Sequence, residues 1–544
     1  MDVLKENVKK LKPAERYCSI LFDEMCLSSG LNYNSSVDII EGLIVDSGTH
    51  RNQNFGDHVL VFMVRGIKKK FKQPISYTFC QGATNQYELV RQLKEVIGEI
   101  HKTGLTVVAT ICDQGRPNED DFYEIEVRRE NGNVERLPIV HLFDVPHLMK
   151  CTRNNLLTKN LHFVTENTPK VAKWDHLVEL YQADSKIEDC KMLPRLTDCH
   201  VMPDKIPKMK VRYSTQVFSQ RVSAIMSFLA SKSVIDPEAA HTAELFLFFD
   251  KLFDSLNGSF HKVIEGKIYR TAVTKKSIQH TLWNDSIKVL STMKFVGKNG
   301  KPVKVPTLTN WITTIKGFQT LSKLLDSKGI KSFLPRHCNQ DSLESLFGGA
   351  RSVSCQNPTC SIFISSYKTL LLNNLVSTHS PGSNCEEFTE SSLLTYKNLF
   401  SFNQENPTQP LCGSNTSRDF DLLKAREYNP SRPSLKYPNT NFRVLVHNII
   451  DLINKCSISH HPNIKSFLVN KIMINFDLNI LHCSKHDQNI EEQIAGCIVK
   501  LFLNHWCTEI NRILSGKIQM RYNDNDPIKQ LANIWRSKHS KKKR

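Results

Sequence analysis

Two adjacent carboxylates interrupt an apolar run near the start of the sequence. Asp23 and Glu24 stand inside YCSILFDEMCL, residues 17–27, a short run that is cut off from its neighbour by SSGLNYNSS. A short apolar run bounded by turn-forming residues is typical of a buried strand. A buried carboxylate costs several kcal/mol unless it is paired or binds a metal. The run therefore raises the question of what these carboxylates bind.

Two further acidic residues have candidate positions at an expected strand end and on an expected helix. Asp113 ends the apolar run in LTVVATICDQG, and Glu344 lies in NQDSLESLFGGAR. Three converging carboxylates suit a pair of Mg²⁺ ions, which prefer oxygen ligands and stabilise both oxygens of an in-line phosphoryl transfer. The sequence has 54 acidic residues, so spacing alone does not single out Asp23, Asp113 and Glu344.

The elements around these acids predict a mixed α/β sheet. Residues 17–27, 36–46 and 58–67 are three strand-like runs separated by Gly, Ser and Asn clusters, which favours a meander. An amphipathic helix follows in residues 85–104, with apolar positions at helical spacing and Gly104 at its end. A fourth strand and a fifth strand that turns into a helix complete the order found in ribonuclease-H-like domains.

The rest of the chain divides by composition into further segments. We expect a basic segment at 1–16, the first part of the sheet domain at 17–155, a mostly helical insertion at 156–334, the last part of the sheet domain at 335–379, a linker or mobile loop at 380–440, a helical C-terminal domain at 441–522 and a basic tail at 523–544. The late helix with Glu344 is placed at 341–347 and ended by two glycines, Gly348 and Gly349.

The net charge indicates the kind of partner, and the cysteines and termini indicate the cellular compartment. The net charge is +18 from 72 basic and 54 acidic residues, which suits a phosphate-rich partner, although an anionic membrane surface would fit as well. The apolar runs are far too short for a membrane span, and the charged N-terminus has no secretory h-region. The 16 cysteines lack framework spacing, so reduced thiols in cytosol or nucleus are expected. The tail SKHSKKKR is either a nuclear localisation signal or a solvated terminus.

Several ordered blocks resemble the P-element superfamily of DNA transposases, which includes vertebrate THAP-domain relatives. The blocks are LFDEM, VFMVRGI, KQPISYTF, VVATICDQG, HLFDVPHLMKCTRNN and NQDSLESLFGGAR, and the resemblance runs from about residue 17 to 375 and resumes near the C-terminus. It implies a ribonuclease-H-like catalytic domain interrupted by a helical GTP-binding insertion, with a helical C-terminal domain. The catalytic, metal-binding acids that it implies are Asp23, Asp113 and Glu344.

The same resemblance implies Mg²⁺- or Mn²⁺-dependent DNA hydrolysis followed by strand transfer, by a homo-oligomer on DNA in the nucleus. Glu24 is expected on the opposite face from Asp23, because successive strand residues alternate sides. The alternative for each acid is a purely structural role, as a satisfied polar group at a strand end or an exposed helix residue.

The GTP site is expected inside the insertion. The sequence has no G-x-x-x-x-G-K-[ST] motif, and GKNGKP at 297–302 indicates a hairpin turn. The resemblance assigns Asp254 and Asn257 to the base, Lys208 and Lys210 to the phosphates, and Asp341 to the side of the catalytic domain. Asp254 and Asn257 share one helix face at i and i+3, and an Asp carboxylate suits the two donors of guanine. The alternative is a polar helix face that ends at Asn257.

Other readings of the Cys, His and basic residues stay open. A zinc site could use four ligands from one C-terminal set, although core packing explains that set as well; its members are His482, Cys483, His486, His505 and Cys507. No Cys/His module precedes Tyr17, so we expect the family's sequence-specific DNA recognition to be absent unless another chain or exon supplies it. Backbone contacts with DNA remain available, and KKKFKQP is one local basic cluster.

Two interpretations from different classes follow. The first is a P-element-like transposase core with intact acids, and the second is a domesticated, non-cutting DNA- or protein-binding factor that retains the fold. A ribonuclease or exonuclease on the same fold would not explain the insertion blocks.

Overall fold

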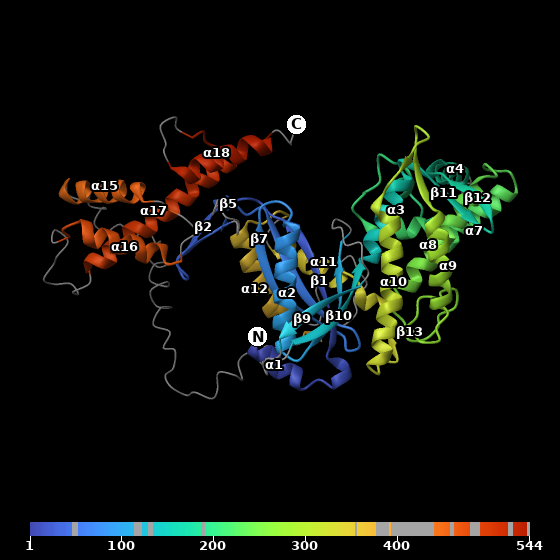
Figure 1. The fold of residues 1–544 in the computed structure, drawn as a ribbon. Helices are drawn as coiled ribbons and strands as arrows, with labels where there is room; N and C mark the ends of the chain where they lie inside the picture. The colour runs from blue at the N-terminus through green and yellow to red at the C-terminus, as the bar shows by residue number, and fades with distance from the viewer. Residues whose placement is uncertain are drawn as a thin grey trace.

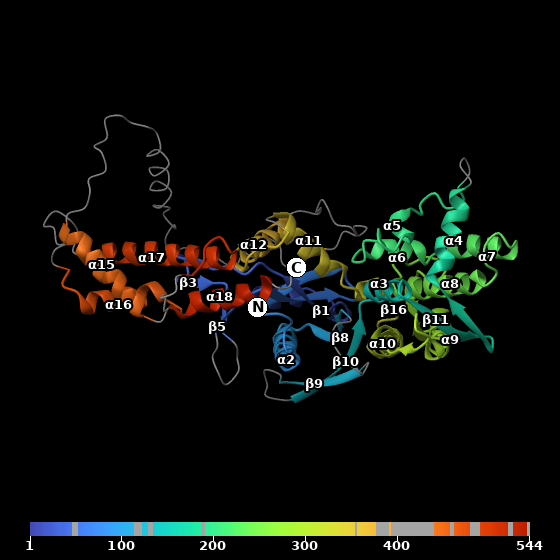
Figure 2. The same cartoon turned by 90° about the horizontal axis from the view of Figure 1, so that it is seen from above.

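The protein consists of three bodies arranged in a row. The computed structural model describes residues 1–45, 53–113, 122–128, 134–186, 191–353, 356–376, 391–392, 440–456, 458, 462–478, 490–520 and 526–540. Figures 1 and 2 show a central sheet domain, a mostly helical insertion at one end and a helical C-terminal body at the other. This arrangement confirms the expected fold class of a mixed α/β domain with a helical insertion.

A seven-stranded sheet forms the centre of the molecule. Its spatial order is β17 (Ser391–Ser392), β7 (Phe71–Cys80), β6 (His58–Gly66), β1 (Tyr17–Cys26), β8 (Thr106–Cys112), β10 (Val134–Phe143) and β9 (Phe122–Arg128). β1, β6 and β7 form an antiparallel meander, whereas β8 runs parallel to β1, and β10 runs parallel to β8. The parallel pairing of β1 with β8 places the ends of the first and fourth predicted strands side by side.

Helices cover both faces of this sheet. Helix α2 (Gln86–Lys102) lies on one face and begins where the side chain of Asn85 accepts from the backbone N–H of Tyr87. Helices α11 (Asp341–Val353) and α12 (Cys360–Val376) lie on the other face. Strand β6 is buried on both of its faces, which explains its continuous apolar run.

The predicted strand at 36–46 is wrong as a member of the meander. Its residues form only the short β3 (Ile39–Glu41) and β4 (Leu43–Val45), which pair with β2 (Asn32–Asn34) and β5 (Gln53–Phe55) in separate two-stranded sheets. Gly42 breaks the run, because its φ of +100° and its contact with a backbone carbonyl leave no room for a side chain. The third strand of the meander is β7 instead.

The insertion combines helices with a small sheet. Its helices are α4 (Trp174–Ser185), α5 (Asp198–Val201), α6 (Val211–Val217), α7 (Gln220–Ser231), α8 (Ala239–Leu256), α9 (Gln279–Thr292) and α10 (Pro306–Ser327). Its strands β12 (Thr168–Ala172), β11 (Lys159–Thr165), β14 (Lys294–Gly297) and β15 (Pro302–Val303) form one sheet, and β13 (Val273–Thr274) pairs with β16 (Ser332–Phe333). The β14–β15 hairpin confirms the turn expected at 297–302.

Two helices join the insertion to the sheet domain. Helix α3 (Val145–Leu156) follows β10 directly and is buried along most of its length. Helix α10 packs on β10 so closely that a side chain at Gly317 would meet Leu142 and the carbonyl of His141. One hydrophobic core runs from the sheet into the insertion through these contacts.

The C-terminal body has its own hydrophobic core. Helices α15 (Thr440–Lys455), α16 (Ile464–Asn475), α17 (Ile490–Leu514) and α18 (Pro527–Ser540) contribute to it. The short strands between β1 and β6 also contribute, through Tyr33, Ile40 and Phe55. The excursion at 31–55 therefore joins the N-terminal and C-terminal parts of the chain.

Three segment boundaries differ from the sequence prediction. Helix α11 continues through both glycines to Val353, so the predicted end at Gly348 and Gly349 is wrong. The expected basic tail contains α18, whose Ile528 and Ala532 are buried. The expected basic N-terminal segment contains α1 (Asp2–Lys9) and the turn η1 (Pro13–Glu15), and its apolar side chains enter the main core because α1 is amphipathic.

Most of the segment predicted as a linker, 380–440, lies outside the described residues. Across the described part of the chain, no helix combines the length and the apolar character that crossing a membrane requires.

Asp38 ties the excursion to the C-terminal body, and its removal tests that connection. Its carboxylate accepts the backbone N–H groups of Lys465 (2.7 Å) and Ser466 (3.1 Å) and the hydroxyl of Tyr33 (2.9 Å). It therefore caps the N-terminus of α16 from a distant part of the chain. We expect Asp38→Ala to destabilise the C-terminal body by about 1–2 kcal/mol, the usual cost of a lost cap.

Hydrogen exchange of the α16 amides measures this effect directly. Asp451→Ala, which removes an exposed acid from α15, is the matched control and should leave exchange in α16 unchanged. Equal protection of α16 in both variants would show that Asp38 does not hold the two parts together.

Candidate active site

The strand register brings two of the predicted acids together. Asp23 lies on β1, and Asp113 follows the last residue of β8. β1 and β8 are parallel, with Leu21 opposite Ile111, so the two carboxylates follow at matching positions at one edge of the sheet. Glu344 lies in the first turn of α11, which packs against β1. The three predicted acids therefore come from three elements that meet at one place.

A buried histidine lies among these acids. His147, in the first turn of α3, has its Nε2 3.0 Å from Glu344 Oε1 and its Nδ1 3.8 Å from Asp113 Oδ1. Nδ1 is also 3.1 Å from Oδ2 of Asp144, the residue that caps α3. The His147 side chain is 9% exposed, whereas those of Asp113 and Glu344 are 42% and 40% exposed. One imidazole thus contacts carboxylates from three directions.

The charges in this cluster depend on one another. Burial would lower the pKa of His147, but Asp144, Glu344 and Asp113 raise it to about 11, so the ring is an imidazolium at neutral pH. Burial raises the pKa of Asp23 to about 7; repulsion from Asp113 and Glu344 adds to the rise, against a backbone hydrogen bond and the His147 charge. The cluster therefore holds more negative than positive charge, and its surroundings disfavour the ionised form of Asp23.

The site rests on a frame of buried hydrogen bonds. Asp144 Oδ1 accepts the backbone N–H of Gln340 at 2.7 Å, and its Oδ2 accepts the N–H of His147 at 3.0 Å. Gln340 Nε2 donates to the carbonyl of Phe22, next to Asp23, at 2.9 Å. Arg65 of β6 donates to Oδ1 of Asn339 at 2.7 Å. These bonds fix the loop that leads into α11 and thereby place Glu344.

The donor set suits divalent cations. Three carboxylates supply the oxygen ligands that Mg²⁺ and Mn²⁺ prefer, and the raised pKa of Asp23 marks a carboxyl whose charge needs more positive charge nearby. In the described structure the ligand atoms of Asp23, Asp113 and Glu344 do not all lie within 4.8 Å of one another. His147 lies between Asp113 and Glu344 and contacts both. A shared cation therefore requires the half-exposed carboxylates to move.

Glu24 has a different environment from Asp23. Its Oε1 accepts the backbone N–H of Thr84, near the start of α2, at 2.9 Å. This contact on the helix side agrees with the expected alternation of the two side chains.

Three of the predicted nucleotide residues lie close to one hydrogen-bond network. Asp254, in the last turn of α8, pairs with Lys267 at 2.8 Å. Asn257, which follows α8, accepts at Oδ1 from Nδ2 of Asn339 at 3.2 Å, and the same Nδ2 donates to Asp341 Oδ2 at 2.9 Å. Asn257 is thus linked to the first residue of α11. Both residues assigned to the base, Asp254 and Asn257, already have partners within the chain.

The two lysines predicted for the phosphates are exposed, and their backbone has a defined role. The carbonyls of Lys208 and Lys210 accept from the guanidinium of Arg153 at 2.6 and 3.4 Å, which fixes the chain before α6. Their ammonium groups have no described contact with Asp254 or Asn257, so their assignment to the nucleotide stays a prediction.

The remaining sequence candidates do not form a described site. His482, Cys483 and His486 lie outside the described residues. Within α17, Cys507 is buried in the C-terminal core while His505 is 75% exposed. Core packing therefore explains Cys507.

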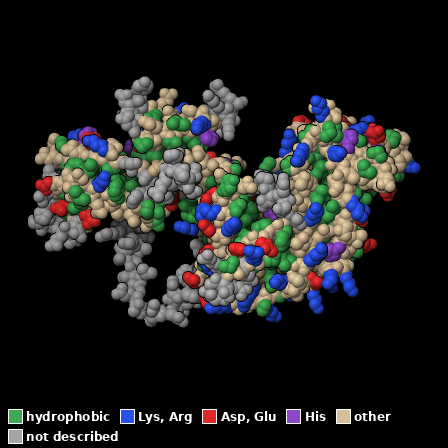
Figure 3. Space-filling view, viewed as in Figure 1, with side chains coloured by type: hydrophobic (Ala, Val, Ile, Leu, Met, Phe, Trp, Pro, Cys, Tyr) green, Lys and Arg blue, Asp and Glu red, His purple; other side chains and the backbone are tan. Residues whose placement is uncertain are grey.

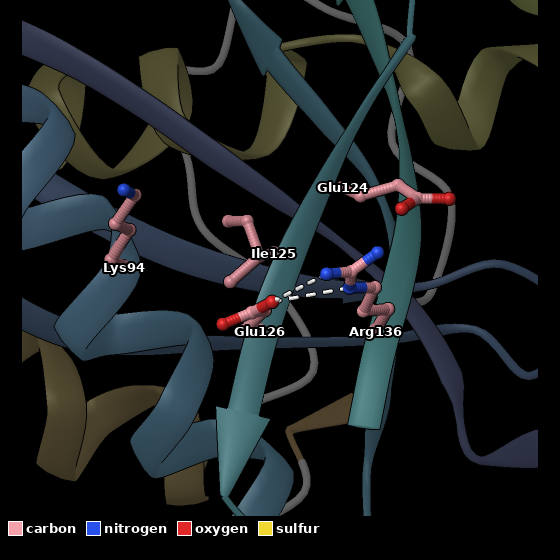
Figure 4. A pocket seen from close by; sticks show the side chains of 5 residues that line it. All are labelled: Lys94, Glu124, Ile125, Glu126 and Arg136. Atoms are coloured by element: carbon pink, nitrogen blue, oxygen red, sulfur yellow. Dashed lines mark hydrogen bonds and ion pairs between the residues drawn. The ribbon is translucent and has the colours of Figure 1, made fainter. Parts of the chain in front are cut away.

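One hollow on the described surface lies apart from the predicted site residues. A hollow between α2 and the strands β9 and β10 is lined by Lys94, Glu124, Ile125, Glu126 and Arg136 (Figure 4). Glu126 pairs with Arg136 there, and none of the predicted site residues lines it. Figure 3 shows Lys and Arg side chains spread over the visible face of the insertion rather than gathered in one patch.

His147 and Asp144 are the site residues that sequence reasoning missed. Both lie in HLFDVPHLMK, which the sequence suggests is a strand followed by a helix and which also belongs to the blocks that carry the resemblance, without marking either residue. The available signal was an Asp at the N-cap of a helix, followed by a Pro in the first turn and by a His three residues after the Asp. It indicates the cap, but only the fold shows that the histidine faces three acids.

Comparison with known proteins confirms the expected resemblance. The family described as "TNP-like, RNase H N-terminal domain" matches residues 1–122, and the one described as "TNP-like, GTP-binding insertion domain" matches residues 146–265. The transposable element P transposase of Drosophila melanogaster is 26% identical over 347 residues, which cover 62% of this chain and 42% of that protein. The chain thus matches less than half the length of this relative.

A solved structure supports the same fold. The Drosophila P element transposase strand transfer complex has a TM-score of 0.55 and 22% sequence identity, covering 68% of this chain and 80% of that chain. This likeness shows the fold alone, and with the two family models it supports a ribonuclease-H-like domain and a GTP-binding insertion domain.

Asp23→Asn tests whether Asp23 belongs to the acidic cluster. Folding raises the pKa of Asp23 from 3.8 to about 7, so this group favours the folded state below the unfolded pKa and loses that contribution as pH rises through 7. Without divalent cations, the Asn variant should therefore be more stable than the wild type at pH 8, by at most about 4 kcal/mol at about 1.4 kcal/mol per unit. Near pH 4.5 the difference should largely vanish.

Urea denaturation in EDTA at the two pH values measures the free energy of unfolding. Glu24→Gln removes the adjacent carboxylate, which contacts Thr84 instead, and should not reproduce the alkaline gain. If Asp23→Asn gains nothing at pH 8, the burial of the Asp23 carboxylate beside Asp113 and Glu344 is wrong.

Proposed function

We propose that this P-element-like chain, with its RNase H and GTP-binding insertion domains, is the core of a DNA transposase. The reaction would be metal-dependent hydrolysis of the DNA backbone followed by strand transfer, with GTP as a cofactor. The observation that carries the proposal is the meeting of Asp23, Asp113 and Glu344 around the buried imidazole of His147. The net charge of +18 supports DNA as the substrate, because phosphate contacts dominate DNA affinity.

Each residue of the site has a distinct part in this proposal. The carboxylates of Asp23, Asp113 and Glu344 would hold Mg²⁺ or Mn²⁺, which stabilises charge on the attacking and leaving oxygens of an in-line transfer. His147 keeps its proton at neutral pH and orients the Glu344 carboxylate through Nε2. Asp144 fixes the backbone of His147, so it positions the site without facing the substrate.

The proposed GTP site lies where the insertion returns to the sheet domain. Asp254 would accept from the two guanine donors, and Asn257 would meet the other edge of the purine. Since Lys267 pairs with Asp254 in this structure, the ammonium group must shift when guanine binds. Asn257 is linked through Asn339 to Asp341, which begins the helix of Glu344, so nucleotide binding would bear directly on the acidic site.

DNA cleavage tests the catalytic part of the proposal. We expect the wild type to nick or cut supercoiled plasmid with Mg²⁺ or Mn²⁺ and GTP, and Asp23→Asn, Asp113→Asn and Glu344→Gln each to abolish cutting. The control Glu24→Gln removes a carboxylate that lies outside the cluster and should cut like the wild type. The substrate should include plasmids with candidate terminal repeats.

Folding of each variant is checked by circular dichroism and DNA binding. If the wild type binds DNA but never cuts any substrate, the non-cutting factor is the correct interpretation. If the acid variants cut as well as the wild type, the chemistry lies elsewhere.

Competition for labelled GTP tests the nucleotide part. Loss of a charge-assisted hydrogen bond costs roughly 1.5–3 kcal/mol, so Asp254→Asn should weaken GTP by about 10- to 150-fold. The amide replaces one acceptor with a donor and should favour XTP, whose extra carbonyl accepts. Asp250→Asn is the matched control, because Asp250 also pairs with Lys267 but is not assigned to the base.

Wild type and both variants are compared for displacement by ATP, GTP and XTP. We expect GTP to win over ATP in the wild type and in Asp250→Asn. Equal displacement by ATP in the wild type, or an unchanged ratio of GTP to XTP in Asp254→Asn, would remove Asp254 from the base site.

A further inference from the structure

A second cluster of potential metal ligands lies in the insertion, on elements other than those of the acidic site. His176 belongs to α4, while Asp236 and Glu238 lie just before α8. One ligand atom from each residue lies within 4.8 Å of the others, which among the described residues marks these three as a group that could hold an ion. His176 Nε2 is 3.6 Å from Asp236 Oδ2, too far for a hydrogen bond.

The histidine of this cluster is buried and held in place. His176 is 3% exposed, and its Nδ1 lies 2.7 Å from Thr242 Oγ1. Its Nε2 is a buried atom with no hydrogen-bond partner, and it faces the two half-exposed carboxylates. If Nδ1 donates to Thr242, Nε2 presents a lone pair to two carboxylates and has no hydrogen-bond partner. A cation between them would give Nε2 a partner and offset the two negative charges.

We propose that His176, Asp236 and Glu238 bind a divalent transition-metal cation of the Zn²⁺ class. One imidazole nitrogen and two carboxylate oxygens form a mixed N/O set that suits Zn²⁺, whereas Mg²⁺ favours oxygen ligands alone. Water would complete the coordination on the exposed side. The Nδ1 contact with Thr242 is the kind of second interaction that orients a metal-binding histidine.

The charges around the histidine favour a cation. Asp236 and Glu238 face the ring, and Glu179 supports the site because its Oε1 accepts the N–H of Asp236 at 3.1 Å. Lys173 is the one ammonium group paired with Glu238 in this part of the described chain, at 2.8 Å.

Lys173 is the internal competitor for Glu238. The side chains of this pair are 33% and 56% exposed, so the ion pair is worth little in water. A divalent cation would displace the ammonium from Glu238 or use the other carboxylate oxygen. The bound metal would link α4 to the start of α8, whose other end carries Asp254, and would thereby brace the insertion.

Zn²⁺ titration of the full chain tests the proposal. The protein is stripped with EDTA, exchanged into excess Mg²⁺ to occupy oxygen-only sites, and titrated with Zn²⁺ by calorimetry while Tm is followed in parallel. The double variant Asp236→Asn/Glu238→Gln should lose one Zn²⁺ equivalent or bind it much more weakly. The loss of affinity should exceed the about 10- to 100-fold that follows when only a residue behind a metal ligand is changed. Its Tm should no longer rise with that equivalent.

Asp175→Asn is the matched control, because it removes an exposed acid from α4 next to His176. It should keep the Zn²⁺ equivalent and the rise in Tm. His176→Gln should lose both, and if this buried change prevents folding, the exposed double variant still decides. Co²⁺ provides a second measurement, since its d–d absorption should appear in the control and be lost in the double variant.

The proposal is wrong if the double variant binds as many Zn²⁺ equivalents as Asp175→Asn, with equal affinity and an equal rise in Tm. The cluster would then be a solvated ion-pair network around a histidine that water satisfies.

Discussion

The buried carboxylate of Asp144 is the interaction on which the active-site region depends. Asp144 is 1% exposed, its N–H donates to the carbonyl of Cys112 at the end of β8, and its two oxygens accept from His147 and Gln340. A buried charge must be paired and hydrogen-bonded to be tolerated. Burial would raise the pKa of Asp144, but its contacts with His147 and Gln340 hold it below the usual value. The charge therefore fixes β8, α3 and the start of α11 relative to one another.

The same constraint explains how a long insertion is compatible with a compact site. The chain leaves the sheet domain through α3, directly after Asp144, and returns through the loop that ends at Gln340. Both ends of the insertion are thus hydrogen-bonded to one side chain. Arg65 and Asn339 extend this frame to Asn257 at the end of α8, so a displacement of α8 must strain bonds that hold Glu344 in place.

Local patterns predict the strands that carry Asp23 and Asp113, whereas the resemblance assigns these acids to a catalytic site and their surroundings depend on distant pairings. Asp23 lies inside one apolar run and Asp113 ends another, and the parallel strands place both at one edge of the sheet. The run at 36–46 is as apolar as a strand of the meander, but Gly42 breaks it and its side chains pack in the core of the C-terminal body. The more polar β7 pairs with β6 in its place. No periodicity reveals that Asp38 caps a helix more than 400 residues away. In the same way, the sequence assigns Asp254 to a base but does not show that Lys267 already pairs with it.

The imidazolium of His147 solves a problem that any cluster of carboxylates poses before a cation arrives. Neighbouring carboxylates repel one another strongly in a partly buried site. Here the positively charged imidazole ring contacts Asp144, Glu344 and Asp113. Because its folded pKa is about 11, this stabilisation is complete below the unfolded pKa near 6.5 and is lost only as pH rises toward 11. Asp23 has the opposite effect on the free energy of unfolding, because its ionisation near neutral pH disfavours the folded state. His147 thus contacts two of the three acids directly, while Asp23 stays a buried carboxyl whose charge a divalent cation would stabilise.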